Sequence, residues 1–500
     1  MVAPVILRSS CYLLPPGHAL TRRWRAAATV ENPAAVEHAR LVRARVRSIH
    51  APRPPATIET WRVIPGPGPW AGGTMIPRGL LPEELRAEVA VEIIDRRREG
   101  DPRSYRLAVE LRPYQAEAIA AFVAAEDGVV VMPCGAGKTT MGIGAIARVG
   151  RRALVLVHTR DLAEQWIARI GGTAEHAAQL PGTRIGVVMG GQRTDDGADV
   201  VVATVQSLAR WGWRDLYEWG AGFGIVVCDE CHHAPAESVL AVLGGIPSRY
   251  RLGLTATPTR HDGLTELIWF TFGSIAYQVT RSDLVAAGAI RPAALTVHRT
   301  GVRVLTHEIQ QEGRRRWRAI DAGEARSLRG EGRGAEIRPR AWAAQVSDLV
   351  GSTERNGQIL ALVVDRVAAG HSVVVLSERV EHCRALAAEL RERGIAAEAV
   401  AGKQGRGEVA AILSRTRCGV TRVLCGTTKA DEGLDVPRLS CGILATPTSA
   451  IGRVTQRLGR IERPGELAPE WIDLVDAIPS AARSAAIRLR AYRGLGMEGA

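Results

Sequence analysis

Short apolar runs alternate with longer amphipathic stretches from Leu111 to about Pro292. The runs read GVVVMP, RALVLVH, TRIGVVM, DVVVAT, GIVVCDE and YRLGLTAT. Such a pattern is typical of buried parallel strands joined by helices. The alternation weakens after this segment and resumes in HSVVVLSE, GIAAEAV, VTRVLCGT, LSCGILAT and EWIDLVDA. The sequence therefore predicts an α/β protein with two tandem units, each built on a parallel sheet.

Changes in composition divide the chain into five segments. Residues 1–107 are rich in Pro and Arg in places and turn helical-looking at LPEELRAEVAVEIIDRRREG; we expect an accessory domain that binds nucleic acid or a partner protein. Residues 108–292 and 346–485 are the two expected α/β domains. Between them, residues 293–345 have the Arg and Gly content of a linker or small insert, and residues 486–500 form a tail.

The chain is strongly basic, with a formal net charge of +13 and a pI near 9.9. This charge indicates a polyanionic partner, although a composition biased toward Arg would also produce it. Of the 65 basic residues only Lys138, Lys403 and Lys429 are lysines. Each of these lysines is therefore a candidate for a chemical role that arginine would not fill. The eight cysteines lack a framework spacing, the apolar runs fall far short of the roughly 20 residues of a membrane helix, and no secretory signal is evident. We expect a cytoplasmic, nucleoid-associated protein without a membrane partner.

A glycine-rich loop follows the first apolar run. VVVMPCGAGKTTMGIGAIA contains Gly135, Gly137, Lys138 and Thr139 in the order of a phosphate-binding loop. The amides of such a loop surround phosphates, the next helix N-terminus favours negative charge, the lysine reaches the phosphates and the threonine can hold Mg²⁺. The general motif has Gly where this chain has Met132. The alternative is a glycine-rich turn without a ligand, but the strand, loop and helix patterns agree on a nucleotide site.

An acidic pair, Asp229 and Glu230, ends the apolar run in FGIVVCDECHHAP. At the carboxyl end of a parallel strand next to the P-loop strand, such a pair would lie where nucleotide-bound Mg²⁺ needs a ligand and an attacking water needs orienting. Cys228 and Cys231 suggest zinc as an alternative, but a structural zinc site needs four ligands and no second pair lies at a workable spacing. Strand alternation predicts a core position for Cys228.

These two stretches resemble motifs of one protein family. DECH at 229–232 is similar to the DExH box of superfamily 2 helicases, and MPCGAGKTT is similar to their motif I, in which the first Gly of the general loop is commonly replaced. Other fragments resemble the remaining motifs in order: LRPYQ (111–115), LVHTRDLAEQW (156–166), VVATVQSL (201–208), GLTATPTR (253–260), VVVLSERVEHC (373–383), VLCGTTKADEGLDVP (423–437) and QRLGRIERP (456–464).

The resemblance implies two tandem RecA-like domains with parallel sheets, an N-terminal accessory domain, and a site for ATP and Mg²⁺. It implies catalytic roles for Lys138, Glu230, Arg460 and Arg463, the two arginines lying on one helical face as arginine fingers. Nucleotide contacts are implied for Gln115, Gly135, Gly137, Lys138, Thr139, Thr140, Asp229, His232, Gly433, Asp435 and Gln456, with Thr139 and Asp229 as metal ligands. The nucleic-acid backbone would contact Arg160, Thr204, Gln206, Arg260, Arg379 and Thr427.

The stretch that begins at GLTATPTR resembles the XPB-like branch, which has phage and bacterial members. In that branch a tripeptide Arg-Glu-Asp, linked to duplex opening, stands where this chain has Arg260, His261 and Asp262. The resemblance implies an ATP-dependent helicase or translocase that acts on single- or double-stranded DNA. The histidine in place of the central glutamate affects the expectation of strand separation, and it leaves the expectation of ATP-driven movement unchanged. Two alternatives stay open: an RNA-directed DExH helicase, and a nucleotide-gated clamp that recruits a partner without processive unwinding.

Overall fold

The computed structural model describes residues 5–8, 11–14, 22, 25–26, 28–31, 57–59, 62–63, 74–78, 92–173, 177–232, 236–258, 263–310, 318–321, 324–327, 336–339, 341–427 and 436–497. They divide near Thr280 into two compact units, each with its own parallel sheet. Within these ranges no helix has both the length and the apolar character to cross a membrane.

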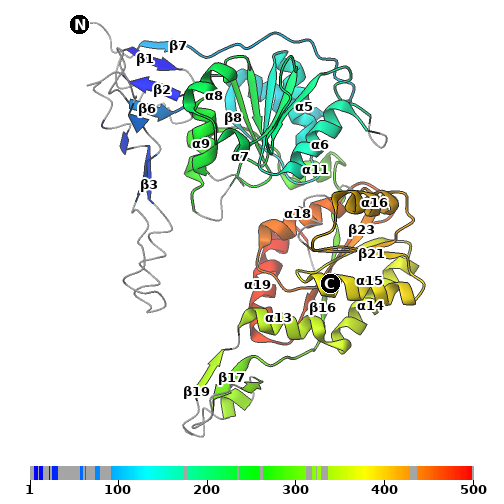
Figure 1. Ribbon diagram of the computed structural model, residues 1–500. Helices are drawn as coiled ribbons and strands as arrows, with labels where there is room; N and C mark the ends of the chain where they lie inside the picture. Colours follow the sequence, from blue (N-terminus) through cyan, green and yellow to red (C-terminus); the bar gives the residue numbers. More distant parts are fainter. Residues whose placement is uncertain are drawn as a thin grey trace. The chain divides into compact units, whose positions relative to one another are not determined.

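An eight-stranded sheet organises the first unit (Figure 1). Its order is β11-β10-β12-β9-β13-β14-β8-β15, and the pairings are parallel except that of β10 with β11. In this order the strands are Gln192–Arg193, Ile185–Met189, Val200–Thr204, Ala153–Val157, Ile225–Cys228, Tyr250–Thr255, Asp127–Val131 and Ile275–Gln278. The predicted buried parallel strands are confirmed, since all residues of β9, β12 and β13 are buried.

Helices cover both faces of this sheet (Figure 1). On one face lie α5 (Lys138–Val149) and α6 (Arg160–Gly171), and on the other α8 (Trp213–Gly220) and α9 (Ala236–Gly244). Further helices are α4 (Pro113–Ala125), α7 (Val205–Leu208) and α10 (Glu266–Phe272). Because the central strands are parallel, their carboxyl ends open into loops at one edge of the sheet, and the predicted motifs of this unit lie there.

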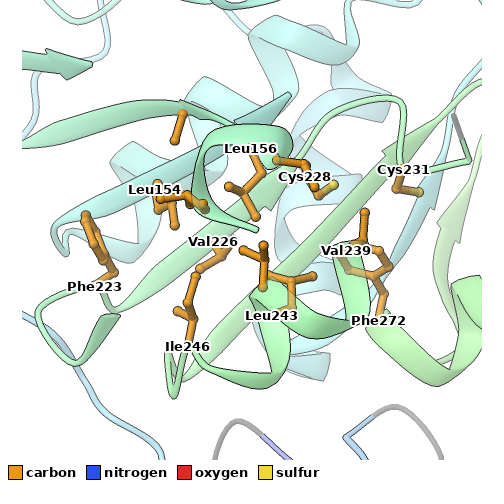
Figure 2. Close-up of a cluster of buried hydrophobic side chains, with 14 of the residues drawn as sticks. Leu154, Leu156, Phe223, Val226, Cys228, Cys231, Val239, Leu243, Ile246 and Phe272 are labelled. Atoms are coloured by element: carbon orange, nitrogen blue, oxygen red, sulfur yellow. The ribbon is translucent and has the colours of Figure 1, made fainter. Parts of the chain in front are cut away.

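Apolar side chains from the strands and from α8 to α10 form a core beneath that edge (Figure 2). Leu154 and Leu156 of β9 meet Val226 of β13 there. Cys228 and Cys231 belong to the same cluster and are 0% and 3% exposed. The predicted core position of Cys228 is confirmed. Asp229 directly follows β13, a strand in which every side chain is buried.

The second unit is built on a six-stranded sheet, β16-β24-β23-β20-β22-β21, in which every pairing is parallel. In this order the strands are Ala294–Arg299, Glu470–Val475, Leu439–Leu444, Ser372–Leu376, Val423–Gly426 and Ala397–Val400. Its helices are α11 (Arg281–Ala286), α13 (Trp342–Gly351), α14 (Thr353–Ala368), α15 (Val380–Glu392), α16 (Arg406–Arg417), α18 (Ile451–Ile461) and α19 (Pro479–Gly494). The prediction of two tandem α/β units with parallel sheets is therefore confirmed.

The segments expected to be a linker and a tail contain elements of this unit, and the limits at 345 and 485 fall inside α13 and α19. β16 lies in the stretch 293–345, which was expected to be a linker or insert, and it forms the edge of the second sheet beside β24. The same stretch contains a small antiparallel sheet of β17 (His307–Gln310), β18 (Arg318–Ile320) and β19 (Glu336–Pro339). At the other end, α19 continues to Gly494, past residue 486, where the tail was expected to begin.

Most of the described residues before Glu99 form strands, whereas Arg22, Arg25 and Ala26 are helical. A five-stranded sheet has the order β5-β6-β2-β1-β7, and β3 pairs with β4. The strands β1 to β7 are Val5–Arg8, Cys11–Leu14, Thr29–Glu31, Thr57–Glu59, Arg62–Val63, Thr74–Pro77 and Glu92–Asp95. The helical prediction over 81–100 is wrong at β7, because Ile93 and Ile94 pair in parallel with Ile6 and Leu7 of β1. Residues 81–91 of that prediction lie outside the described ranges.

Candidate functional site

The glycine-rich loop joins β8 directly to α5, as the sequence predicts. β8 ends at Val131, α5 begins at Lys138, and Gly137 is its N-cap residue in the left-handed conformation, with φ of 79°. Gly135 also has a positive φ, 84°. These backbone conformations favour glycine and turn the chain sharply into the helix. The amides of the first helical turn then face the loop, where a phosphate would lie.

Gln115 packs against this turn from α4. Its side-chain amide donates a 3.4 Å hydrogen bond to the Gly137 carbonyl, and its Oε1 accepts a 3.0 Å bond from the Arg112 amide. Gln115 is 3% exposed, so this residue, for which a nucleotide contact is implied, also supports the P-loop itself. On the other side, Gln179 Nε2 donates to Thr140 Oγ1 at 3.2 Å. Thr139 and Thr140 are both partly exposed in the first turn of α5.

Substitution of Gly137 by alanine is expected to weaken nucleotide binding by at least about tenfold. A Cβ there would lie 2.5 Å from Gln115 Nε2, and φ of 79° is strained for any side chain. Equilibrium binding of a fluorescent ATP analogue measures the effect. Gly182→Ala is the matched control, since Gly182 has φ of 80° with nothing within 4 Å of the added Cβ. Equal affinities of Gly137→Ala and the control would contradict the prediction.

Lys138 and Glu230 face each other across the carboxyl edge of the sheet. The Lys138 ammonium lies 3.6 Å from Glu230 Oε1 and 3.4 Å from the Met132 carbonyl. Both side chains are largely buried, with exposed fractions of 11% and 17%. Glu230 has a positive φ of 47°, a conformation that non-glycine residues seldom adopt and that clusters at functional sites. The turn after β13 therefore holds this carboxylate in a strained backbone beside the P-loop lysine.

Asp229 is held by two hydrogen bonds. Its Oδ2 accepts from the Trp166 indole at 2.7 Å, and its Oδ1 accepts from the Glu230 amide at 2.9 Å. Burial and the adjacent Glu230 carboxylate raise the pKa of Asp229 to about 6, while the bond from Trp166 and the charge of Lys138 act in the opposite direction. Sequence reasoning missed Trp166; it ends the quoted motif at 156–166, but the sequence does not show which way its indole points.

One expected neighbour relation is wrong. The strand of the acidic pair was expected next to the P-loop strand, but β14 lies between β13 and β8. Strands are spaced by about 4.8 Å, so the two strands are about 10 Å apart. The long side chains of Lys138 and Glu230 span this separation, and the intervening β14 contributes Thr255 at the same edge.

His232 links the acidic pair to Thr255. His232 Nδ1 lies 3.5 Å from Glu230 Oε2 and 2.7 Å from Thr255 Oγ1. Thr255 Oγ1 also accepts a 3.1 Å bond from the Thr257 amide and lies 2.7 Å from the Thr257 carbonyl. A continuous set of contacts therefore joins Lys138, Glu230, His232 and Thr255, which come from three sequence motifs.

The two cysteines lie among the apolar side chains of the core cluster (Figure 2). Burial raises the pKa of both thiols above the ordinary range, and the Asp229 carboxylate adds to the effect at Cys228. A thiol with a raised pKa is a poor metal ligand because the thiolate is the ligating form. Cys228 and Cys231 therefore act as apolar core residues in this fold.

The polar groups at the edge suit a divalent cation that prefers oxygen. Asp229 and Glu230 place two carboxylates together in a largely buried position, and Thr139 brings a hydroxyl from the turn beside Lys138. Magnesium binds through one or two carboxylates and substrate phosphates. The residues present therefore fit Mg²⁺ bound together with a nucleotide.

The first-unit residues predicted to contact nucleic acid also lie at this edge. Arg160 is the first residue of α6, after β9, and Thr204 is the last residue of β12, the neighbour of β9. Gln206 Nε2 donates to the His158 carbonyl at 2.8 Å, and Thr204 Oγ1 lies 2.8 Å from Ser207 Oγ. The structure thus brings these three residues together at two adjacent strand ends. Arg260 lies outside the described residues.

In the second unit, Arg379 and Thr427 follow the neighbouring strands β20 and β22. Arg379 caps α15, and its guanidinium donates to the Ala343 carbonyl at 3.2 Å. Gln456 and Arg460 lie on α18, but this helix ends at Ile461. The expectation that Arg460 and Arg463 share one helical face is therefore wrong, because Arg463 lies beyond the helix end. Gly433 and Asp435 fall outside the described residues.

A buried carboxylate lies at the end of α18. Glu462 is 2% exposed, accepts from the Ala293 amide at 3.0 Å and forms an ion pair with Arg281. Burial raises the pKa of Glu462 despite the opposing charge of Arg281. Pro464 disfavours the helical conformation at the preceding Arg463, so α18 stops at Ile461, and the contacts of the C-cap residue anchor this end.

Two family models match the chain over its two α/β units. The model described as "Type III restriction enzyme, res subunit" matches residues 108–260, and the model described as "Helicase conserved C-terminal domain" matches residues 354–465. The two matches include the P-loop, the acidic pair and the segment of Arg460 and Arg463. The chain belongs to the superfamily 2 helicases.

Its distant relatives are helicases of the XPB type and of phages. The chain is 27% identical over 380 residues to "DNA 3'-5' translocase XPB2" of Sulfurisphaera tokodaii, a match that covers 73% of this chain and 82% of that protein. It is 33% identical over 193 residues to "DNA 3'-5' helicase XPB" of Mycobacterium tuberculosis, covering 37% and 33%. It is 24% identical over 365 residues to "Probable helicase D10" of Escherichia phage T5, covering 72% and 70%.

Proposed function

We propose that this protein is a DNA-stimulated ATPase that uses ATP hydrolysis to move along DNA or to open it. The observation that carries the proposal is the set of contacts from Lys138 through Glu230 and His232 to Thr255. It lies at the sheet edge that also holds Arg160, Thr204 and Gln206 at the ends of β9 and β12. A nucleotide site and a strand-contacting surface on one edge are what an ATP-driven translocase requires.

The residues would divide the reaction as follows. Lys138 and the amides after Gly137 bind the phosphates, and Glu230 orients and deprotonates the attacking water. Thr139 and Asp229 would hold Mg²⁺, which supplies charge neutralisation on the phosphate oxygens when bound. His232 transmits changes at the phosphate end to Thr255.

We propose roles for four further groups of residues. Arg460 and Arg463 would stabilise charge on the transferring phosphoryl group, and Gln456, Gly433 and Asp435 would contact nucleotide. Arg260, Arg379 and Thr427 would contact the nucleic-acid backbone. The segment 1–107 would bind DNA or a partner protein. The relatives support DNA as the nucleic acid, since two of them carry DNA in their names at 27% and 33% identity.

A comparative ATPase assay tests this function. ATP turnover of the full chain is measured with duplex DNA, single-stranded DNA and RNA of equal length. We expect stimulation by DNA that exceeds stimulation by RNA and that falls steeply with salt, because backbone contacts release counterions. Stimulation by RNA alone would show that the protein is an RNA-directed helicase.

A strand-displacement assay separates movement from clamping. A translocase displaces the third strand of a DNA triplex while it hydrolyses ATP, and we expect this displacement here. A protein that hydrolyses ATP in a DNA-dependent manner and leaves the triplex intact would be a nucleotide-gated clamp instead.

A further inference from the structure

Trp166 connects helix α6 to Asp229 in the candidate nucleotide site. It lies in the middle of α6, is 0% exposed, and donates its indole N–H to Asp229 Oδ2 at 2.7 Å. Hydrogen bonds to a buried carboxylate are among the stronger ones in proteins, and they fix its orientation. Since the Glu230 amide holds the other oxygen at 2.9 Å, the rotation of the Asp229 carboxylate is determined by these two donors.

The indole ring also packs against the P-loop helix. A Cβ added at Gly142 would lie 2.7 Å from Trp166 Cη2 and 3.0 Å from Leu254 Cδ1. Gly142 stands one turn after Lys138 on α5, so the ring occupies the space that a side chain at this position would need. Trp166 therefore touches both the helix that presents Lys138 and the carboxylate that ends β13.

The same helix begins at the surface predicted to contact nucleic acid. Thr159 caps α6 by accepting from the Leu162 amide at 3.3 Å, and Arg160 is the first helical residue. The guanidinium of Arg160 lies under Gly190, where an added Cβ would be 2.7 Å from Nη2. Trp166 follows six residues later, about 9 Å along a rigid helix. A shift of the α6 N-terminus would therefore move the indole against Asp229 and Gly142.

We propose that Trp166 is a positioning residue that couples strand contact at the start of α6 to the orientation of Asp229. When nucleic acid contacts Arg160, the helix moves and its indole sets the Asp229 carboxylate for the nucleotide-bound cation. This proposal rests on the proposed function, because it assumes that α6 contacts nucleic acid. In this proposal Trp166 acts through Asp229 and makes no direct contact with ATP or DNA.

Trp166→Phe tests the proposal, since phenylalanine retains most of the packing and lacks the N–H. We expect the Mg²⁺ concentration for half-maximal binding of a non-hydrolysable fluorescent ATP analogue to rise by about tenfold or more, as for loss of a hydrogen bond to a charged group. We also expect stimulation of ATPase activity by DNA to fall by about tenfold while the Kd for DNA stays unchanged. An unchanged Mg²⁺ dependence, or an unchanged stimulation, would overturn the proposal.

Trp471→Phe is the matched control. Trp471 is also 0% exposed, and its indole donates to the Tyr492 hydroxyl at 2.9 Å in the second unit. Both variants should lower Tm, but the control should leave the Mg²⁺ dependence and the stimulation by DNA unchanged. If both variants change these two quantities equally, Trp166 has a structural role alone and the proposal is wrong.

If Trp166→Phe fails to fold, a spectroscopic measurement tests the proposal instead. With 5-fluorotryptophan placed at position 166 alone, the ¹⁹F signal should shift when single-stranded DNA is added without nucleotide, and Arg160→Ala should remove that shift. A ¹⁹F signal that does not shift when DNA binds would overturn the proposal. A wild-type protein that binds DNA without any stimulation of ATPase activity would instead refute the proposed function, while the Mg²⁺ titration would still report on the bond to Asp229.

Discussion

Replacement of Glu230 by glutamine is expected to lower ATP turnover by about 10²- to 10⁴-fold, the contribution of a positioned general base. The carboxylate lies 3.6 Å from the Lys138 ammonium and 3.5 Å from His232 Nδ1, so its charge is central to the site. Glutamine has the same shape and cannot accept a proton from water. Steady-state phosphate release with saturating DNA measures the loss, and affinity for a fluorescent ATP analogue should stay within a few-fold of the wild type.

Glu117→Gln is the control for this substitution. Glu117 is an exposed residue of α4 that accepts a hydrogen bond from the Tyr277 hydroxyl, so its change removes one carboxylate without touching the site. Its turnover should equal that of the wild type. Near-normal turnover of Glu230→Gln would show that another group activates water.

Substitution of Asp473 by asparagine is expected to destabilise the second unit by about 3–5 kcal/mol, as for removal of one partner from a buried ion pair. Asp473 and Arg488 are both fully buried, and two bonds of 2.7 Å join them. The Tyr492 hydroxyl also donates to Asp473 at 2.9 Å. The variant leaves the Arg488 guanidinium buried without its counter-charge. Urea unfolding followed by circular dichroism measures the change.

An exposed ion pair supplies the comparison. Glu381 and Arg384 lie three residues apart on α15, with Nη1 and Oε1 2.8 Å apart and side-chain exposures of 82% and 54%. Glu381→Gln should cost less than about 1 kcal/mol, because exposed pairs are screened by water. A similar loss for both variants would mean that burial does not set the strength of the Asp473 pair.

The glycine-rich loop and the acidic pair of the candidate site could be placed from sequence because each is local. Glycines at 135 and 137, the lysine after them and the acidic pair after an apolar run each need a particular backbone or charge at a fixed point of a strand, loop or helix. Their order along the chain sufficed to place them at one edge of a parallel sheet. The predicted core position of Cys228 is confirmed, although all four residues of β13 are buried and their burial does not alternate.

Two wrong expectations depended on contacts between distant segments, and a third had a local cause. Residues 93 and 94 were expected to be helical, but they form a strand because β1 pairs with them. Arg463 follows Arg460 at helical spacing, but α18 stops at Ile461 because Pro464 disfavours a helical Arg463. The order of strands β13, β14 and β8 is a property of the whole sheet.

The sequence by itself determined the superfamily 2 helicase family, the two α/β units and the positions of the glycine-rich loop and the acidic pair, because each is encoded in a short segment with its own pattern. Only the tertiary structure decided which side chains meet. Strand order set Lys138 opposite Glu230, and helix packing aimed the indole of Trp166 at Asp229, 63 residues away in the chain. Side-chain direction on a packed helix depends on its neighbours from distant segments, and a linear pattern does not contain them.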